Sequence, residues 1–144
     1  MALATLQWYG PGLKRVIDGE IDFNGHTFKA VLIDSSYTPN RDTDDDLSDV
    51  IGNEATGTGW TTGGETLTVT TGINTGSGYV YVNIADINKT GVTLSDGKHL
   101  VVFDDTHASD ALVFLMTFDT ALAPVAGNLD IDFPASNGAG RISY

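Results

Sequence analysis

The residues best suited to chemistry in this sequence are three aspartates at alternate positions of one acidic segment. Asp42, Asp44 and Asp46 stand at positions 1, 3 and 5 of a loop, where an EF-hand places carboxylates for calcium. The pattern then fails, because a leucine replaces the glycine of the sharp turn and an asparagine replaces the bidentate glutamate. A hard cation could still bridge these acids with Asp49, so the four carboxylates are weak candidates for a metal site. We expect a solvated loop instead.

Other potential catalytic groups lack the arrangement that catalysis needs. Asp104 and Asp105 are adjacent, and neighbouring residues of a strand point to opposite faces, whereas glycoside hydrolysis needs two carboxyl groups flanking one substrate. His26, His99 and His107 are scattered without the spacing of metal ligands. No Gly-x-Ser-x-Gly motif presents a serine nucleophile. We therefore predict that the protein is not an enzyme and uses no cofactor.

The glycine-rich segment 57–64 resembles a phosphate-binding loop only in its glycines. It lacks the lysine, and a strand-like run rather than a helix follows it. Its Trp60 is more informative, because a large ring on such a loop either caps the core or anchors a partner. Trp8 and Tyr9, just before the Gly-Pro-Gly break at 10–12, are ambiguous in the same way. They pack on the domain or form an arm that docks elsewhere.

Size and composition predict one globular domain that is stabilised by its core. The chain has 144 residues, of which 41% are hydrophobic and 18% are charged, and such a composition is typical of a folded domain. Cysteine is absent, which excludes disulfides and thiolate metal sites. A formal net charge of −12 repels nucleic acid, and no apolar run approaches the length of a membrane span. We therefore expect neither nucleic acid nor a membrane among the partners.

The hydrophobic pattern predicts many short strands and one short helix near the N-terminus. Pro11 can open a helical turn, three apolar residues after it share one helical face, and Gly19 is a plausible end. Strand candidates recur at the spacing of a sandwich or barrel. They are residues 28–33, 66–71, 79–84, 92–94, 100–103, 112–118, 129–133 and 141–144.

These elements predict an all-β fold, an antiparallel β-sandwich or jelly roll with one short N-terminal helix. Residues 1–20 are expected to form an N-terminal arm and the helix, and residues 21–144 the sandwich domain. The runs 112–118 and 79–84 are apolar on both faces, so each is central in two layers or covered by another element. The N-terminal helix and a neighbouring subunit of a homo-oligomer are the two candidate covers.

Several segments resemble a family of small bacteriophage virion proteins that are encoded among head and tail genes. The similar segments are residues 19–23, 27–39, 48–50, 56–64, 101–106, 111–119, 129–135 and 140–144, together with Glu54 and Leu67. The resemblance covers nearly the whole chain from Leu13, whereas the first dozen residues match nothing in the family. Its motifs are structural rather than catalytic.

The resemblance implies a β-sandwich or jelly roll that decorates, or cements, the outer shell of a capsid. It implies a homotrimer that bridges subunits of the major capsid protein, located on the virion exterior after synthesis in the host cytoplasm. An acidic domain without a reaction centre is compatible with this position, because repulsion from packaged DNA carries no penalty there. The residues expected to contact the shell or a neighbouring subunit are Trp8, Tyr9, Tyr37, Asp42, Asp44, Asp46 and Trp60.

Two other roles stay open. One is a different structural component of the particle, in the tail, the neck or the base of a head fibre. The other is a carbohydrate-binding module for host adhesion, which would present exposed aromatic rings as platforms. The candidate rings for that role are Trp60, Tyr37, Tyr79 and Tyr81.

Overall fold

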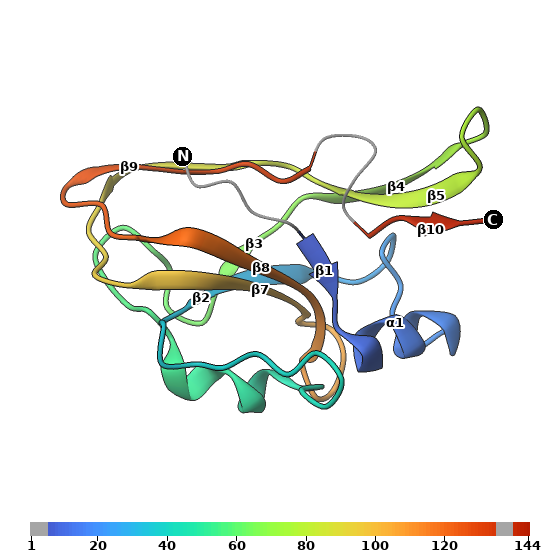
Figure 1. The fold of residues 1–144 in the computed structure, drawn as a ribbon, viewed down its shortest axis with the longest axis horizontal. Coiled ribbons are helices and arrows are strands. Elements are labelled where there is room, and N and C mark those ends of the chain that lie inside the picture. The colour runs from blue at the N-terminus through green and yellow to red at the C-terminus, as the bar shows by residue number, and fades with distance from the viewer. Residues whose placement is uncertain (1–5, 135–139) are drawn as a thin grey trace.

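The computed structural model describes residues 6–134 and 140–144, and they form an all-β fold of antiparallel sheets with one α-helix (Figure 1). This confirms the predicted fold class. The helix is α1 (Gly10–Ile17), and two 3₁₀ turns cover Leu47–Asp49 and Ile51–Asn53. The strands are β1 (Leu6–Trp8), β2 (Phe28–Ile33), β3 (Glu65–Thr66), β4 (Val69–Asn74), β5 (Tyr79–Ile84), β6 (Ile87–Val92), β7 (Gly97–Asp104), β8 (Ala111–Leu122), β9 (Gly127–Ile131) and β10 (Ile142–Ser143).

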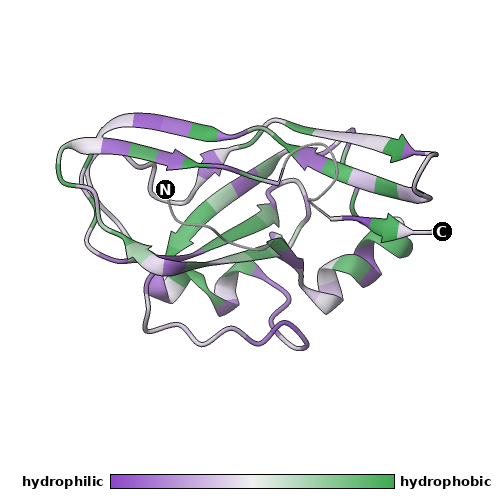
Figure 2. Ribbon diagram, turned by 45° about the horizontal axis from the view of Figure 1, so that its top comes forward, coloured by the Kyte–Doolittle hydropathy of each residue, from purple (hydrophilic) through white to green (hydrophobic). Residues whose placement is uncertain are grey.

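The strands form two layers. One layer is a five-stranded sheet in the order β1-β8-β7-β2-β3, and the other contains the pair β6-β9 and the three-stranded sheet β10-β5-β4 (Figure 1). Side chains from both layers, among them Leu100, Phe114, Leu129 and Ile131, form one buried cluster, the main core. In Figure 2 hydrophobic and hydrophilic bands alternate along the upper layer, as expected for strands with one face in the core.

The outer face of the five-stranded sheet carries a second core. Val101, Phe103 and Leu115 on this face are buried together with Tyr37 and Val50 from the segment 34–54. In the described chain this acidic segment covers the outer face of β7 and β8. The other apolar run, β5, keeps Val80 exposed. The sequence pattern predicted the need for a cover but not its source.

A β-bulge in β8 alters the predicted alternation of its side chains. The register with β7 shifts between Val102 and Phe103, which pair with Phe114 and Leu112 respectively, so one residue of β8 is extra. As a result Leu112 belongs to the outer core and Val113 to the main core. Strict alternation along 112–118 predicts the reverse, with Leu112 on the face of Phe114 and Val113 on the face of Leu115, because it allows for no bulge.

The N-terminal segment is packed from the first described residue. β1 pairs with β8, and Trp8 lies opposite Phe114. The predicted helix is present with a proline in its first turn, and Gly19 follows it with a φ of 81°, which favours glycine. The helix lies close to β8 because Gly12 has no side chain, and a Cβ there would lie 2.1 Å from the Leu112 carbonyl oxygen. Residues 1–5 of the expected arm lie outside the described residues.

The predicted strand 66–71 is two strands in different layers. β3 pairs with β2 in the five-stranded sheet, whereas β4 pairs with β5 in the three-stranded sheet. The chain therefore crosses between the layers at residues 67 and 68. This crossing places the β4–β5 hairpin opposite β1 and α1, where it forms one wall of the groove described below.

Candidate functional site

The buried tyrosines of the acidic segment have partners inside the protein. The Tyr37 hydroxyl donates a hydrogen bond to Asp44 Oδ2 at 2.6 Å and lies 3.0 Å from the Tyr9 hydroxyl. Asp44 Oδ2 also accepts the Asn40 backbone N–H at 2.9 Å. Burial raises the pKa of both Tyr9 and Tyr37, so both phenols stay protonated. Both rings are buried in the described single chain, whereas the sequence analysis placed them on a contact surface. Their contact with a partner stays a prediction.

The other carboxylates of the segment hold its backbone in place. Asp49 Oδ2 accepts the backbone N–H groups of Asp45 and Asp46 at 2.9 and 3.2 Å. Arg15 Nη1 donates to the Asp45 carbonyl oxygen at 2.7 Å and lies 3.1 Å from Asp46 Oδ1. The Leu112 N–H donates to the Asp45 carbonyl oxygen at 2.9 Å, which ties the segment to β8. These bonds tie the segment to α1 and β8.

The four weak metal candidates do not assemble into a site. Asp44, Asp46 and Asp49 each bind different internal donors, and Asp42 is exposed. Among residues 6–134 and 140–144, no three acidic or histidine side chains are grouped so as to hold a metal ion.

Trp60 caps the main core. Its ring is 4% exposed, and the Lys89 ammonium lies 5.8 Å from the ring centroid on its outer side. Of the two interpretations that the sequence allowed for Trp60, the described structure therefore favours capping of the core.

The carbohydrate-binding alternative, which needs exposed aromatic rings, loses support because Tyr37, Tyr79 and Trp60 are buried. The fourth ring, Tyr81, is half-buried.

The buried acid among the candidate catalytic groups closes a turn. Asp104 Oδ1 accepts the backbone N–H groups of Thr106 and His107 at 3.0 and 3.2 Å, and its Oδ2 lies 2.6 Å from His26 Nδ1. Its neighbour Asp105 pairs instead with Lys29 at 2.9 Å. The two carboxyl groups therefore serve different partners, as their adjacency in the sequence predicted.

A serine, a histidine and a glutamate meet at the same turn, where the serine follows the histidine by two residues. Ser109 Oγ lies 3.0 Å from His107 Nδ1, and His107 Nε2 lies 3.4 Å from Glu20 Oε2. The Ser109 backbone N–H also points at His107 Nδ1, at 3.3 Å. This ring nitrogen thus closes the turn between β7 and β8. His99 is elsewhere, buried and 2.9 Å from Thr117 Oγ1, and burial lowers its pKa.

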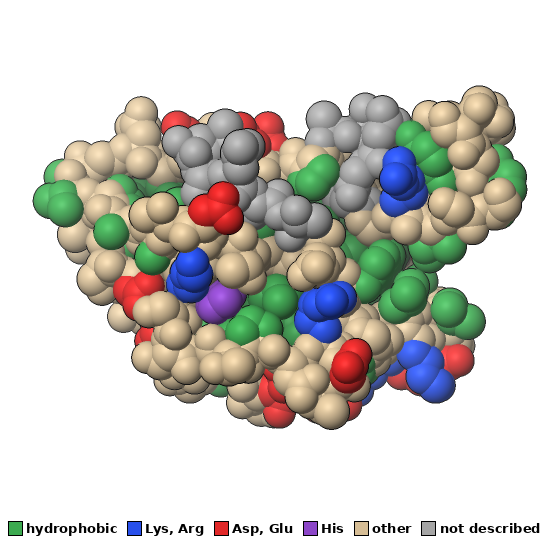
Figure 3. Space-filling model, viewed as in Figure 1, with side chains coloured by type: hydrophobic (Ala, Val, Ile, Leu, Met, Phe, Trp, Pro, Cys, Tyr) green, Lys and Arg blue, Asp and Glu red, His purple; other side chains and the backbone are tan. Residues whose placement is uncertain are grey.

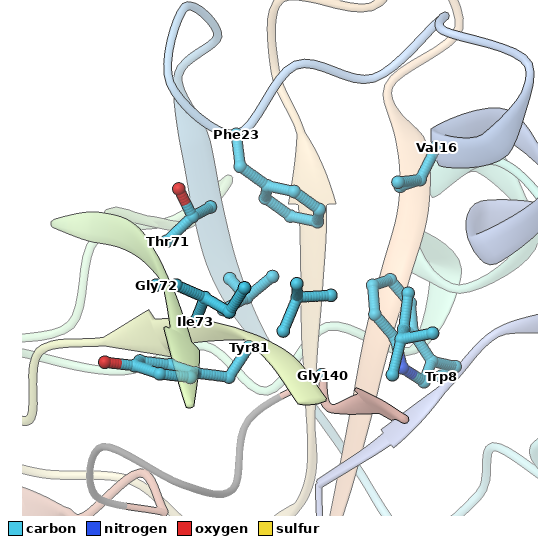
Figure 4. A pocket seen from close by; sticks show the side chains of 11 residues that line it. Trp8, Val16, Phe23, Thr71, Gly72, Ile73, Tyr81 and Gly140 are labelled. Carbon is cyan, nitrogen blue, oxygen red and sulfur yellow. The ribbon is translucent and has the colours of Figure 1, made fainter. Parts of the chain in front are cut away.

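An apolar groove of about 310 Å³ lies between the β4–β5 hairpin and the base formed by β1 and α1. The described residues that line it include no acidic, basic or histidine side chain. Its lining residues come from both layers and the segment between α1 and β2 (Figure 4): Trp8, Val16, Phe23, Thr71, Gly72, Ile73, Val80, Tyr81, Val82, Gly140 and Ile142.

The base of the groove is an aromatic cluster continuous with the main core. The Trp8 ring lies 4.3 Å from Phe114 and 6.1 Å from Phe23, measured between ring centroids. Phe23 in turn stacks on Phe28 at 5.0 Å. Trp8 Nε1 is buried and makes no hydrogen bond with any described residue. Of the seven predicted contact residues, Trp8 is the one that lines this groove.

The opposite wall is kept thin by a glycine. Gly72 of β4 pairs with Tyr81 of β5, and a Cβ on Gly72 would lie 2.4 Å from Cζ of the Tyr81 ring. The ring lies across the strand at this point, as aromatic residues commonly do beside a strand glycine. Ile73 and Val80 are the next pair along the hairpin, so their side chains lie on its other face, and both are exposed.

Exposed hydrophobic side chains continue around the groove. Ile73 is 59% exposed, and Val80 and Ile142, which also line the groove, are exposed as well. Ile17 and Tyr144, next in the chain to lining residue Val16 and to β10, are exposed too. Figure 3 shows hydrophobic side chains gathered at the right-hand end of the molecule, between the hairpin and the helix.

Sequence reasoning did not select these residues, although the sequence contains a signal for them. Residues 66–85 include no acidic, basic or histidine residue, in a chain with a net charge of −12. An uncharged run in such a chain indicates a surface that avoids charge, a core strand, or both.

A second, more open hollow has a volume of about 540 Å³. Its described lining includes small and hydroxyl side chains such as Thr58, Thr93 and Ser95, and no charged residue.

No known protein family, curated protein or solved structure matches this chain. None of the described helices is long and apolar enough to cross a membrane. The function is therefore inferred from the chain's own residues and from the resemblance noted above.

Proposed function

We propose that this protein is a non-enzymatic structural component of a bacteriophage particle. It decorates and stabilises the outer shell, which the major capsid protein forms. It does so as a homo-oligomer, in the simplest case a trimer. The observation that carries the proposal is the uncharged groove with its exposed hydrophobic rim. Such a surface suits adhesion, since exposed apolar patches mark interaction sites.

The use of the reactive side chains supports a role without catalysis. Asp104, the buried acid, closes a turn together with His107, and the tyrosine hydroxyls bind each other and Asp44. Among the described residues that line the groove, none has a charged side chain that could act as an acid, a base or a ligand.

The charge distribution also supports a position on the outside of a particle. The net charge of −12 keeps a protein soluble at high local concentration and away from packaged DNA. A decoration protein needs only modest affinity at each contact, because many contacts repeated by symmetry act together.

The test is reconstitution on capsids that lack this chain. We expect the purified protein to bind them saturably, in hundreds of copies per particle, and to raise the temperature at which the shell breaks down. Quantitative mass spectrometry of intact particles gives the copy number. A few copies per particle would indicate a tail, neck or fibre-base component instead, and no binding to shells would contradict the proposal.

A further inference from the structure

We infer that the groove and its hydrophobic rim form the contact between copies of this chain. This inference rests on the part of the proposed function in which the protein assembles with itself. The contact surface comprises Trp8, Phe23, Ile73, Val80 and Ile142, to which Ile17 of α1 adds an exposed side chain. This contact surface lies outside the acidic segment and the Trp60 loop, which the sequence analysis had suggested as contacts with the shell or a neighbouring subunit.

The distribution of charge favours a second copy of this chain as the partner that occupies the groove. Each copy has a net charge of −12, with 19 acidic against 7 basic residues, so most approaches between copies bring carboxylates together. The hairpin that forms one wall lies within residues 66–85, which have no charged residue at all. Two copies that meet through this wall avoid the like-charge repulsion that opposes contact elsewhere. A basic partner, in contrast, would be drawn to the acidic surfaces rather than to this one.

The same end of the molecule supplies both a groove and the side chains to fill one. Among the described residues, six large hydrophobic side chains are exposed: Ile17, Ile73, Val80, Val125, Ile142 and Tyr144. All except Val125 line the groove, belong to α1 or directly follow β10, whereas Val125 lies in the β8–β9 loop at the opposite end (Figure 1). Two copies that join through this end therefore bury apolar surface on both sides, as in a self-complementary contact.

The edge of β4 offers backbone groups to the same contact. β4 is the last strand of its sheet, and the Thr68 and Asn74 carbonyl oxygens accept bonds from the hairpin partners Ala85 and Gly78. Because bonding alternates along an antiparallel strand, the backbone groups of Ile73 point away from β5. Edge strands of monomeric proteins are usually protected by charged residues or proline, and β4 has neither.

A single charge placed in the groove tests the inference. In Ile73→Asp, an aspartate has to enter an apolar contact, so we expect the dissociation constant of the oligomer to rise by at least about 100-fold. Ile73 is 59% exposed in the single chain, so its replacement should leave the circular-dichroism spectrum of the folded chain unchanged. The matched control is Val125→Asp, which adds the same charge at a residue that is 82% exposed and should assemble like the wild type.

Sedimentation equilibrium over a wide concentration range measures the assembly of the three proteins. A wild type that stays monomeric, or an Ile73→Asp variant that assembles as well as Val125→Asp, would overturn the inference. A dimer and a trimer both agree with it, since each brings the same ends together.

Spin labels give a second readout that does not depend on weakening the oligomer. The chain has no cysteine, so Ile73→Cys and Val125→Cys each introduce one unique labelling site. We expect strong dipolar coupling between labels at residue 73 of neighbouring copies, and weak or no coupling at residue 125. Equal coupling at both positions would contradict the inference.

The two proposals can fail separately. If the wild type assembles through residue 73 but does not bind shells, the role in the particle is wrong and the contact between copies stands. If the protein binds shells while Ile73→Asp assembles normally, the decoration role stands and the groove is not the contact between copies.

Discussion

The acidic segment 34–54 and the uncharged hairpin formed by β4 and β5 contrast in charge and in burial. The segment is rich in aspartates, yet its Tyr37 and Val50 are buried in the outer core. The hairpin has no charged residue, yet Ile73 and Val80 are exposed. In this protein the charged segment is therefore a cover, and the neutral hairpin is the surface left available for contact.

Hydrogen bonding explains the difference. An aspartate can accept the backbone N–H groups of a tight turn, so a chain of irregular structure can lie on a sheet without unpaired donors. Asp49 does this for Asp45 and Asp46. A strand at the end of a sheet satisfies only half of its backbone groups internally, so the other half faces outward. The number of charges in a segment thus does not reveal which segment keeps its hydrophobic side chains exposed.

The largest loss in the free energy of unfolding is expected from substitutions in the outer core, where the acidic segment covers the sheet. Phe103→Ala should lower the free energy of unfolding by about 3–5 kcal/mol, because the buried ring leaves a cavity in the outer core. Ile73→Ala, at the exposed wall of the groove, should change it by less than about 0.5 kcal/mol. Urea denaturation followed by tryptophan fluorescence measures both. Similar losses in the two variants would show that the two regions are equally packed in solution.

A smaller loss in the free energy of unfolding is expected when the Tyr37 hydroxyl is removed, which links the acidic segment to Tyr9 near the N-terminus. Tyr37→Phe removes the donor to Asp44 and the partner of the Tyr9 hydroxyl, so the loss should be about 1–2 kcal/mol. The matched variant Tyr81→Phe removes a hydroxyl that makes no hydrogen bond with the described residues, and it should be nearly neutral. Equal denaturation midpoints for both variants would refute the role given to the Tyr37 network.

The smallest expected effect is a decrease in the free energy of unfolding as the pH falls below neutrality. His99 is buried beside Tyr37, with 5.5 Å between the ring centroids, and burial lowers its pKa in the folded protein. The unfolded chain therefore binds a proton at His99, from a pH of about 6.5 downward, before the folded chain does. The free energy of unfolding should accordingly be unaffected by this group above that pH and should decrease as the pH falls below it.

His99→Gln removes this titration, so its stability should fall less steeply than that of the wild type between pH 7 and pH 5. His107→Gln keeps His99 and should retain the steeper fall. Denaturant titrations at several pH values measure these slopes. A wild type and a His99→Gln variant with parallel profiles would contradict the expected coupling.

Much of the fold was predictable from local patterns. The runs that became β2 and β5 were assigned with their observed bounds, because alternating or continuous β-branched residues between turn signals specify a strand. The helix followed from the proline in its first turn and the glycine that follows it. The predicted run 66–71 was not one strand, since nothing local shows that the chain crosses between layers after β3.

The candidate site was less predictable, because its parts are far apart in the sequence. Trp8, Phe23 and Ile73 meet only after β1 has paired with β8 and the hairpin has folded back over both. Trp60 and Tyr37 were expected at a contact surface, since aromatic residues in loops are ambiguous until their neighbours are known.

The sequence by itself determined the all-β class, the short helix, the need for a cover over two-faced strands and the absence of charge from residues 66–85. These properties follow from the periodicity and composition of contiguous residues. Only the tertiary structure decided that the acidic segment is the cover and that the neutral hairpin leaves its hydrophobic side chains exposed. The reason is physical: burial depends on which segments the strand order brings together, and that pairing joins residues far apart in the chain.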